Sequence, residues 1–478
     1  MMPETNQETL TILYTNDIHS HFETMGRIAA MISELRAEAP ASTLLLDIGD
    51  HMDRAAIETE GTLGLANVDV LNLTGYDAVT IGNNEGLTFT PELLGQAYAG
   101  LHGSVICGNI LEARTGQPPA WMQSRKVVHK AGLKIGLVAA TAAFVEFYEL
   151  LGLKTLNPLD TIAKDVGELR GEVDLVIVMS HLGLPMDRQL AETIPGIDLI
   201  IGGHTHHLLE EPLRIGSTIV TAAGKFGNFL GKVVARRDSA TGRFRMDGVC
   251  LPVAEGPKQE QIETAIALQR EAARHRLNRT VAVTDRELPV SYEAESPFGN
   301  LLAQAVRRHT GSEFALVNSG QLLSGLPAGE ISEGMLHERC PSPINPCTMQ
   351  VSGEDILASL EESLLEEKTG KTIMGFGFRG KVLGGICVDG LEIEYDPGAP
   401  PYGRIVQASV AGVPLREDQT YLVGTLDMFT FGVGYERLKR GTEKRYMLPE
   451  FLRDLLRLEL QTAGAVETCF QSRWKKVE

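Results

Sequence analysis

The chain has 478 residues, of which 44 are Lys or Arg and 62 are Asp or Glu, so its net charge is −18. A negative charge of this size excludes binding to a polyanion through overall charge, because such binding needs clustered basic residues. Hydrophobic residues make up 43% of the chain and charged residues 22%, as in folded globular proteins with packed cores. At about 150 residues per domain, this length predicts two or three domains.

Six cysteines are scattered along the chain without a Cys-x-x-Cys pair, and we expect buried reduced thiols rather than a disulfide framework. The residues from Met1 to Glu8 contain neither a basic nor an apolar stretch, so they do not resemble a secretory signal. No apolar run reaches the roughly 18 residues of a membrane helix. We therefore expect a cytoplasmic protein with no membrane partner, unless a leader has been removed.

Short apolar runs alternate with amphipathic segments in the first half, which predicts strands interleaved with helices. Most of these runs are apolar throughout, so we expect flanking layers to cover both faces of the sheets. The predicted strands are 9–14, 43–46, 78–81, 105–107, 134–139, 174–179, 198–201, 218–221 and 229–235. The predicted helices are 26–37, 62–73, 91–99, 161–171 and 185–193.

The alternation breaks near residue 253, and a highly charged helix with few large apolar residues is predicted over 259–278. We interpret this helix as a connector between two domains rather than as a core element. A strand-rich region with more turn residues follows it to the end of the chain. The predicted division is a domain of residues 1–253, a connector of residues 254–280 and a second domain of residues 281–478.

Metal-binding side chains follow five of the predicted strands. Ligands of open α/β sheets bind beyond the carboxyl ends of strands, where loops from separate strands converge. Glycines beside these side chains let the backbone turn sharply and approach closely. Each fragment alone is a weak signal, but together they are hard to attribute to packing. The candidate ligands are Asp17, His19, Asp50, Asn83, His181, His204 and His206.

This set of imidazole and oxygen donors, without thiolate, suits Mn²⁺, Fe²⁺, Co²⁺ or Zn²⁺ better than an all-oxygen Ca²⁺ site. Seven ligands exceed what one ion needs, whereas two ions about 3.5–4 Å apart with a bridging carboxylate would use them all. Such a pair lowers the pKa of bound water and stabilises the attacking and leaving oxygens of a displacement at phosphorus. The sequence therefore predicts a hydrolase with two divalent metal ions.

Five blocks between residues 10 and 235 resemble the signature of the calcineurin-like metallophosphoesterases, and the two-domain plan resembles their bacterial 5′-nucleotidase branch. The blocks are Asp17-x-His19, Gly49-Asp50, Gly82-Asn83-x-Glu85, His181 and Gly203-His204-Thr205-His206. The resemblance implies an α/β fold, with a four-layer αββα catalytic domain and a smaller α/β domain that supplies a nucleoside pocket. It also implies a first metal held by Asp17, His19, Asp50 and His206, and a second held by Asp50, Asn83, His181 and His204, with Asp50 as the bridge.

One block departs from the family pattern at Asn84, where the family has a histidine that protonates or stabilises the leaving oxygen. The aspartate that usually orients this histidine also has no counterpart. General acid catalysis is typically worth about 10²–10⁴ in rate. Three explanations are open: a leaving group that needs no proton donor, replacement by His21 or His207, or a protein without turnover. Both of these histidines could also be surface or outer-shell residues.

The second domain departs from the pattern further. Asn318 stands where the nucleotidases have Asn-Gly-Gly followed by an arginine, which is missing here. The segment 425–435 stands in place of their Gly-Gly-Asp turn but lacks its acidic residue. The segment 375–380 carries two aromatic rings and a guanidinium that suit stacking and phosphate binding, or a hairpin whose aromatic rings fill the core. The candidates for substrate contact are Asn318, Phe376, Phe378, Arg379, Phe431 and Tyr435.

These patterns predict a metal-dependent phosphohydrolase that acts on a phosphoester or phosphoanhydride of a nucleotide or a similar small molecule. The alternatives are a non-catalytic relative that binds metal and nucleotide and, more remotely, a hydrolase of sulfur esters. We expect a small phosphorylated substrate as the partner, and no polymeric nucleic acid.

Overall fold

The computed structural model describes residues 8–238, 241–253 and 255–477. The predicted lack of a secretory signal thus falls almost wholly outside the described residues. Within them, no helix combines the length and the apolar character needed to span a membrane. All six cysteines are buried free thiols, as predicted. The chain divides into two compact units, Met1–Ala273 (unit 1) and Arg274–Glu478 (unit 2), each described by itself.

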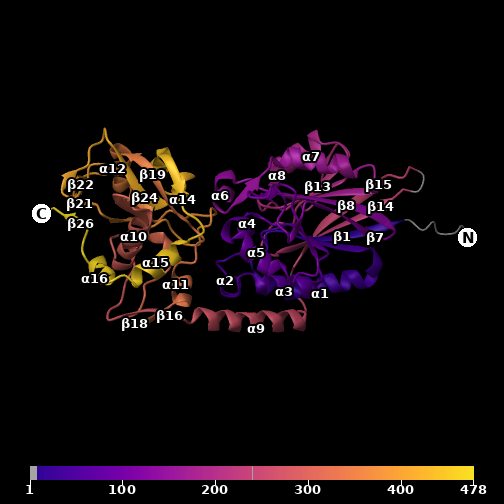
Figure 1. Cartoon of the computed structure of the whole chain (residues 1–478), viewed down its shortest axis with the longest axis horizontal. Coiled ribbons are helices and arrows are strands. Elements are labelled where there is room, and N and C mark those ends of the chain that lie inside the picture. The colour runs from indigo at the N-terminus through magenta and orange to yellow at the C-terminus, as the bar shows by residue number, and fades with distance from the viewer. Residues whose placement is uncertain (1–7, 239–240, 254, 478) are drawn as a thin grey trace, which may run out of the picture. The chain divides into compact units, whose positions relative to one another are not determined.

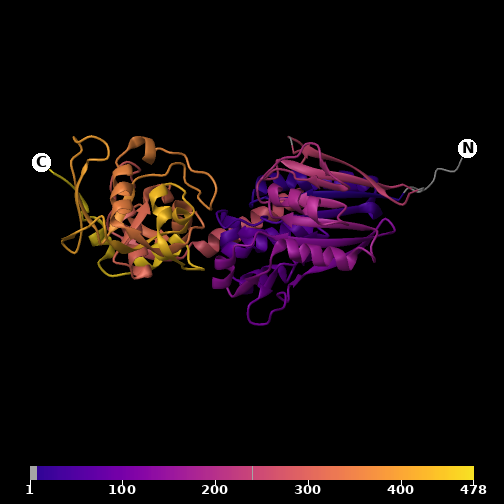
Figure 2. The ribbon, with the colours of Figure 1, turned by 90° about the horizontal axis from the view of Figure 1, so that it is seen from above.

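Unit 1 is built on two sheets, whose long strands are seen from above in Figure 2. The first sheet has, in spatial order, β15 (Phe244–Pro252), β14 (Phe229–Arg237), β1 (Thr9–Thr15), β2 (Thr43–Asp47), β3 (Ala78–Val79), β4 (Ser104–Ile106) and β6 (Met122–Gln123). The second has β12 (Leu213–Ile215), β13 (Thr218–Thr221), β11 (Leu199–Gly202), β10 (Leu175–His181), β8 (Leu133–Thr141) and β7 (Arg125–Lys130). Strands β5 (Ile110–Glu112) and β9 (Leu153–Thr155) form a separate pair.

Helices cover the outer face of each sheet, with α1 and α3 on one side and α7 and α8 on the other (Figure 1). The helices are α1 (Phe22–Glu38), α2 (Ile57–Thr62), α3 (Leu65–Thr74), α4 (Asn83–Thr88), α5 (Pro91–Tyr98), α6 (Val145–Leu150), α7 (Pro158–Leu169) and α8 (Leu184–Thr193). Each of the predicted strands and helices of the first half has a counterpart here. The predicted helix 62–73 is interrupted, because Leu63 and Gly64 have φ values of +54° and +88° and separate α2 from α3.

Three hydrophobic clusters fill the spaces between these layers. Ile12 of β1 and Leu137 of β8 meet between the two sheets. Leu13, the next residue of β1, points to the other face and packs in the cluster that includes Ile28 of α1. Val178 of β10 packs in the cluster that includes Val166 of α7. Both faces of the central strands are therefore buried, which confirms the predicted four-layer αββα arrangement.

Helix α9 (Glu260–Leu277) occupies the predicted connector but also contributes to the core of unit 1. Ile262 is fully buried, and Ile266 is 6% exposed in the same cluster as the α1 side chains. Arg270 adds an ion pair with Glu58 at 2.6 Å. The helix is therefore more than the spacer expected, since its few apolar residues recur on one face and pack against unit 1.

Unit 2 contains a five-stranded sheet of β20 (Ile386–Asp389), β17 (Phe314–Asn318), β24 (Thr420–Leu426), β19 (Pro346–Ser352) and β25 (Thr442–Tyr446). A second sheet has β23 (Val413–Pro414), β22 (Ile405–Val410), β21 (Glu392–Tyr395) and β26 (Trp474–Lys476), and β16 (Thr280–Thr284) pairs with β18 (Gly329–Ser332). The helices are α10 (Pro297–Thr310), α11 (Glu333–Arg339), α12 (Gly353–Glu362), α13 (Glu366–Thr369), α14 (Asp427–Thr430), α15 (Leu452–Leu460) and α16 (Ala465–Cys469).

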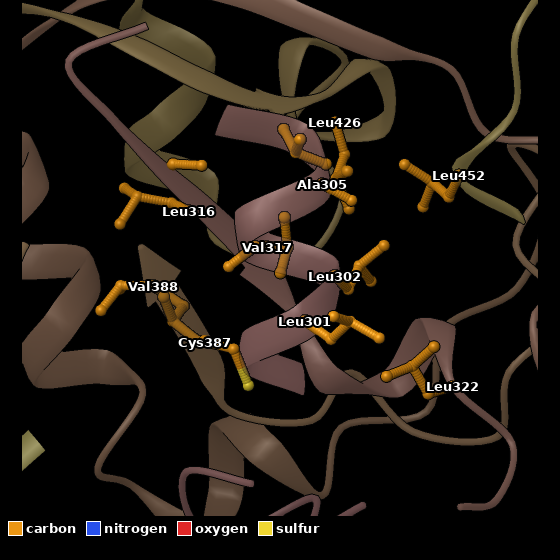
Figure 3. Packing of buried hydrophobic residues seen from close by; sticks show 14 of the residues in the cluster. Leu301, Leu302, Ala305, Leu316, Val317, Leu322, Cys387, Val388, Leu426 and Leu452 are labelled. Carbon is orange, nitrogen blue, oxygen red and sulfur yellow. The ribbon is translucent and has the colours of Figure 1, made fainter. Parts of the chain in front are cut away.

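Helix α10 packs on the five-stranded sheet and forms the core of unit 2. Leu301 and Leu302 lie in one buried cluster with Val317 of β17 and Val388 of β20 (Figure 3). Leu452 of α15 belongs to the same cluster. Unit 2 is thus a mixed α/β domain with its own hydrophobic core, as the predicted two-domain plan requires.

Candidate metal centre

The candidate ligands of unit 1 gather where the parallel strands of both sheets end. Strands β1, β2 and β3 pair in parallel in the first sheet, and β8, β10 and β11 do so in the second. Asp17 and Asp50 follow β1 and β2, Asn83 begins α4 after β3, His181 ends β10, and His204 follows β11. Because the two sheets stack face to face, these strand ends bring residues far apart in the sequence to one place.

Two overlapping groups of side chains each place their ligand atoms within 4.8 Å of one another. In one group, Nε2 of His206 lies 3.1 Å from Nε2 of His19 and 3.5 Å from Oδ1 of Asp17. In the other, which combines Asp17, Asp50 and His181, Nε2 of His181 lies 3.4 Å from Oδ2 of Asp50. The same Oδ2 lies 3.8 Å from Nε2 of His19, so the Asp50 carboxylate stands between the two groups.

Two further predicted ligands lie beside these groups. Nδ1 of His204 is 2.7 Å from Oδ1 of Asn83, and the ring of His204 is 5.3 Å from that of His181. Each of the seven predicted ligands thus has a close contact with another member of the set.

The chemistry of this donor set fits a divalent cation. Nε2 of His181 is buried and makes no hydrogen bond within the described part of the chain. The Nε2 atoms of His19 and His206 face each other at a distance where only one can carry a proton. A cation between such atoms would take the place of protons on these nitrogens.

Several ligands are held in a backbone conformation that side chains with a Cβ rarely adopt. Positive φ values cost on the order of 1–3 kcal/mol each at non-glycine residues, and they cluster at functional sites. The hydrogen bond from the N–H of Asp17 to the carbonyl oxygen of Gly49, at 3.0 Å, helps to keep this geometry. The φ values are +51° at Asp17, +48° at His19, +50° at Asp50, +71° at His204 and +57° at His206.

The electrostatics of the centre separate the histidines by charge. Burial lowers the pKa of His204 and of His206 to about 4, which leaves both rings neutral and able to bind metal. Burial would also lower the pKa of His181, but the carboxylates of Asp50 and Asp17 outweigh it and raise that pKa to about 10. Without a cation, His181 thus carries the positive charge that offsets the buried carboxylates.

Glu85 holds the loops after β2 and β3 together. Its buried carboxylate accepts hydrogen bonds from the N–H groups of Gly82, Asp50 and Met52 at 2.8, 3.0 and 2.7 Å. Burial raises the pKa of Glu85 to about 7. Gly82 is required beside it, because a Cβ at this position would lie 2.0 Å from Oδ1 of Asp50.

The residue that replaces the family histidine lies directly against the centre. The N–H of Asn84 donates to Oδ1 of Asp50 at 2.7 Å, and its Nδ2 lies 2.9 Å from Nδ1 of His19. His21 lies at the rim, where its ring is 4.0 Å from that of Phe226 and its Nδ1 is 2.7 Å from Glu23. His207 is exposed, with its Nδ1 2.8 Å from Oγ1 of Thr205.

Two residues near the centre were not among the candidates predicted from the sequence. Phe226 has a φ of +62° and places its ring 5.8 Å from His19 and 6.5 Å from His206. The flanking glycines of Gly224-Lys225-Phe226-Gly227 were the signal, because they mark a tight turn just before a predicted strand. Asp53 lies with its Oδ2 3.7 Å from Nδ1 of His19, and nothing in its local sequence indicates this contact.

The substrate candidates of unit 2 divide into exposed and buried side chains. Phe376 is 60% exposed and Phe431 is 37% exposed, and their rings stack with centroids 5.9 Å apart. Asn318, Phe378 and Tyr435 are buried. Of the two aromatic rings in the segment 375–380, that of Phe376 faces solvent and that of Phe378 fills the core.

Hydrogen bonds explain the buried positions. Nδ2 of Asn318 donates to the carbonyl oxygen of Leu383 at 2.6 Å, and the Tyr435 hydroxyl donates to that of Gly384 at 2.8 Å. Arg379 donates from its backbone N–H to Oγ of Ser342 at 3.0 Å. Asn318 and Tyr435 thus hold Leu383 and Gly384 in place.

Comparison with known proteins gives matches for both units of the chain. Residues 10–208 match the calcineurin-like phosphoesterase family, and residues 275–440 match the 5′-nucleotidase C-terminal domain. YunD, an uncharacterized metallophosphoesterase of Bacillus subtilis, is 33% identical over 460 residues, which cover 95% of this chain and 99% of YunD. The chain belongs to the calcineurin-like phosphoesterase family. It is accordingly a metal-dependent phosphoric ester hydrolase.

More distant relatives share the two-domain plan of this phosphoesterase. A 5′-nucleotidase of Mus musculus is 24% identical over 511 residues, which cover 91% of this chain and 85% of that protein. The solved structure of the NAD nucleotidase NadN of Haemophilus influenzae superposes with a TM-score of 0.70 at 14% identity, covering 98% and 99% of the two chains. This likeness confirms the fold.

A buried carboxylate in unit 2 makes the stability of the phosphoesterase depend on pH. Asp427, at the start of α14, accepts a hydrogen bond from the N–H of Asn345 at 3.2 Å. Its Oδ1 is buried and makes no hydrogen bond with any residue that the structure describes. Burial raises the pKa of Asp427 from 3.8 to about 7. The folded state therefore favours the protonated acid, and this stability is lost as the pH rises through 7.

Replacement of this acid by its neutral isostere, Asp427→Asn, should raise the free energy of unfolding at pH 8 relative to the wild type. The gain should shrink as the pH falls toward 4, because the folded wild-type carboxyl is then neutral like the amide that replaces it. A shift of this size corresponds to at most about 4 kcal/mol. Urea unfolding of both proteins at pH 5 and pH 8 measures the difference. An advantage of the variant that is the same at both pH values would contradict the prediction.

Proposed function

We propose that this phosphoesterase hydrolyses a phosphoester or phosphoanhydride of a nucleotide, or of a similar small molecule, with two divalent metal ions. The observation that carries the proposal is the gathering of six donor side chains around the Asp50 carboxylate. Asp17, His19, Asp50 and His206 would hold the first ion, and Asp50, Asn83, His181 and His204 would hold the second. Mn²⁺ is the first candidate, and Fe²⁺, Zn²⁺ and Co²⁺ suit the same donors.

Two ions are supported by the position of Asp50 between Nε2 of His19, at 3.8 Å, and Nε2 of His181, at 3.4 Å. A single carboxylate oxygen with imidazole groups on two sides is the arrangement that a bridging ligand needs. When bound, such ions supply a water of lowered pKa and stabilise the charge on the reacting phosphoryl group. Glu85 and the strained loops would keep the ligands in position before the ions bind.

The lack of a proton donor at position 84 favours substrates with good leaving groups. The amide of Asn84 can donate a hydrogen bond but cannot transfer a proton, so the leaving oxygen receives no proton from this position. A phosphoanhydride or an aryl ester needs none, because its leaving group is stable as an anion. His21, at the rim beside Phe226, is the candidate donor for other substrates, while His207 is the weaker candidate because its contact is with Thr205.

A nucleotide substrate is supported by unit 2. This unit carries the 5′-nucleotidase C-terminal domain, and the 5′-nucleotidase of Mus musculus matches over most of both chains. The stacked rings of Phe376 and Phe431 offer an exposed aromatic face, and stacking of a base on such a face is worth about 1–3 kcal/mol. In this proposal residues 1–253 perform catalysis and residues 281–478 recognise the substrate. A role in nucleotide catabolism in the cytoplasm would agree with the six free thiols.

Removal of a ligand should empty the centre and abolish activity together. For Asp50→Ala and His204→Ala we expect loss of bound Mn²⁺ and at least a 100-fold fall in phosphate release. Metal analysis of the purified proteins measures the first effect. A panel of nucleoside mono- and diphosphates, dinucleotides and p-nitrophenyl phosphate measures the second. His129→Ala, which removes an exposed histidine of β7, is the matched control and should change neither.

Full turnover in either ligand variant would show that the assignment of ligands is wrong. If the wild type retains two equivalents of metal but releases phosphate from no member of the panel, the non-catalytic alternative is correct.

The family histidine can be restored with Asn84→His. A proton donor at this position should accelerate substrates with poor leaving groups, such as nucleoside monophosphates, by at least 10-fold in kcat. The same variant should leave the rate on p-nitrophenyl phosphate within a factor of about three, because p-nitrophenolate needs little protonation. Comparison of kcat on both substrates tests the explanation, which fails if the two rates change in parallel.

Loss of the exposed aromatic face should weaken nucleotide binding selectively. For Phe376→Ala we expect KM for a nucleoside monophosphate to rise about 5- to 100-fold, while KM for ribose 5-phosphate, which lacks a base, stays unchanged. Tyr402→Ala removes another exposed aromatic residue of unit 2 and serves as the control. Equal changes in KM for the two substrates would rule out base stacking by Phe376.

A further inference from the structure

The two ring nitrogens of His19 face different groups. Nε2 points to the candidate ligands, 3.1 Å from Nε2 of His206 and 3.8 Å from Oδ2 of Asp50. Nδ1 points to a second set of groups, 2.9 Å from Nδ2 of Asn84 and 3.7 Å from Oδ2 of Asp53. A neutral imidazole that binds metal through Nε2 carries its proton on Nδ1. The metal-binding form of His19 therefore needs a hydrogen-bond acceptor beside Nδ1.

Asn84 does not provide this acceptor in its present orientation. Its Nδ2, which lies next to Nδ1 of His19, is a donor only. Its carbonyl oxygen accepts from Nδ2 of Asn83 at 3.4 Å instead. The carboxylate of Asp53 is an acceptor in every orientation, so it is the group near Nδ1 that suits the metal-binding form.

A buried polar network fixes the position of Asp53, whose side chain is 6% exposed. Its Oδ1 accepts from the N–H of Ala55 at 2.8 Å, and its Oδ2 lies 3.7 Å from Nδ1 of His19. The N–H of Asp53 donates to Oγ of Ser20 at 2.8 Å. Oγ of Ser20 in turn lies 2.7 Å from Oγ1 of Thr59 and accepts from Nδ2 of Asn67 at 3.0 Å. Ser20 follows His19 directly, so one network holds both partners.

We propose that Asp53 is a positioning residue of the metal centre. Its Oδ2 accepts the Nδ1–H of His19 and so keeps the ring in the form whose Nε2 is free to bind the first ion. A proton on Nδ1 would pair a donor with a charged acceptor, which favours a separation shorter than the 3.7 Å observed. The inference rests on the proposed metal centre. A partner of this kind typically contributes 10- to 100-fold to metal affinity.

The variant Asp53→Asn tests this role with little other change. The asparagine Oδ1 can still accept from the N–H of Ala55, while the acceptor that faces His19 becomes an NH₂ donor. Calorimetric titration of the metal-stripped protein with Mn²⁺ should show one of two sites weakened 10- to 100-fold, with the other site within threefold. Melting of the metal-free proteins checks that the fold is kept. Asp165→Asn is the matched control, because it removes a carboxylate of similar burial that pairs with Arg125, and its Mn²⁺ affinities should equal those of the wild type.

The wild type provides a second measurement that does not depend on the variant. In the Zn²⁺-loaded protein, ring ¹H–¹⁵N spectra should show His19 with a proton on Nδ1 that exchanges slowly with solvent, identified by its absence in His19→Gln. Unchanged Mn²⁺ affinity of Asp53→Asn, or a His19 ring without this proton, would overturn the role of Asp53. A wild type that binds no Mn²⁺ would instead overturn the proposed metal centre itself.

Discussion

The parallel pairing of β1, β2 and β3, and of β8, β10 and β11, is the constraint on which the metal centre depends. Parallel strands end on the same side of a sheet, so every loop that follows one of them starts at the same edge. The hydrophobic core between the sheets, which includes Ile12 and Leu137, holds the ligand-bearing edges of the two sheets close together. The free energy of hydrophobic burial thus brings the polar ligands into contact, although the ligands themselves are not part of the hydrophobic core.

That gathering carries an electrostatic cost. Asp17 and Asp50 are buried with ligand atoms within 4.8 Å of each other, and the buried carboxylate of Glu85 lies against the backbone of Asp50. Like charges at such distances disfavour the ionised forms. Protonated His181 offsets this charge without metal, and the N–H groups around Glu85 offset more of it. The left-handed backbone of the ligand loops adds strain that only the surrounding packing can maintain. A centre assembled against these costs is prepared for divalent cations, whose charge would relieve most of them.

The predictable parts of the molecule are those that follow from local pattern. Apolar runs such as 43–46 became buried parallel strands, and polar residues beside glycine after them became the candidate ligands. Side-chain direction in irregular segments did not follow from pattern. Phe376 and Phe378 have the same glycine-flanked context, yet one is exposed and the other buried, because the tertiary fold decides which ring meets the core. The packing of Ile262 in the core of unit 1 could not be predicted either, because α9 carries many charged residues.

The contacts of Asn84 indicate a role other than that of the histidine which it replaces. A residue retained only as a weak substitute for a general acid would be expected to point at the substrate, but Asn84 directs its amide to His19 and its N–H to Asp50. Both groups of Asn84 therefore lie against candidate ligands. The lost general acid would be worth about 3–5.5 kcal/mol on a poor leaving group and almost nothing on a phosphoanhydride. A centre that stabilises its ligands in place of protonating the leaving group is consistent with substrates whose bonds to phosphorus already break easily.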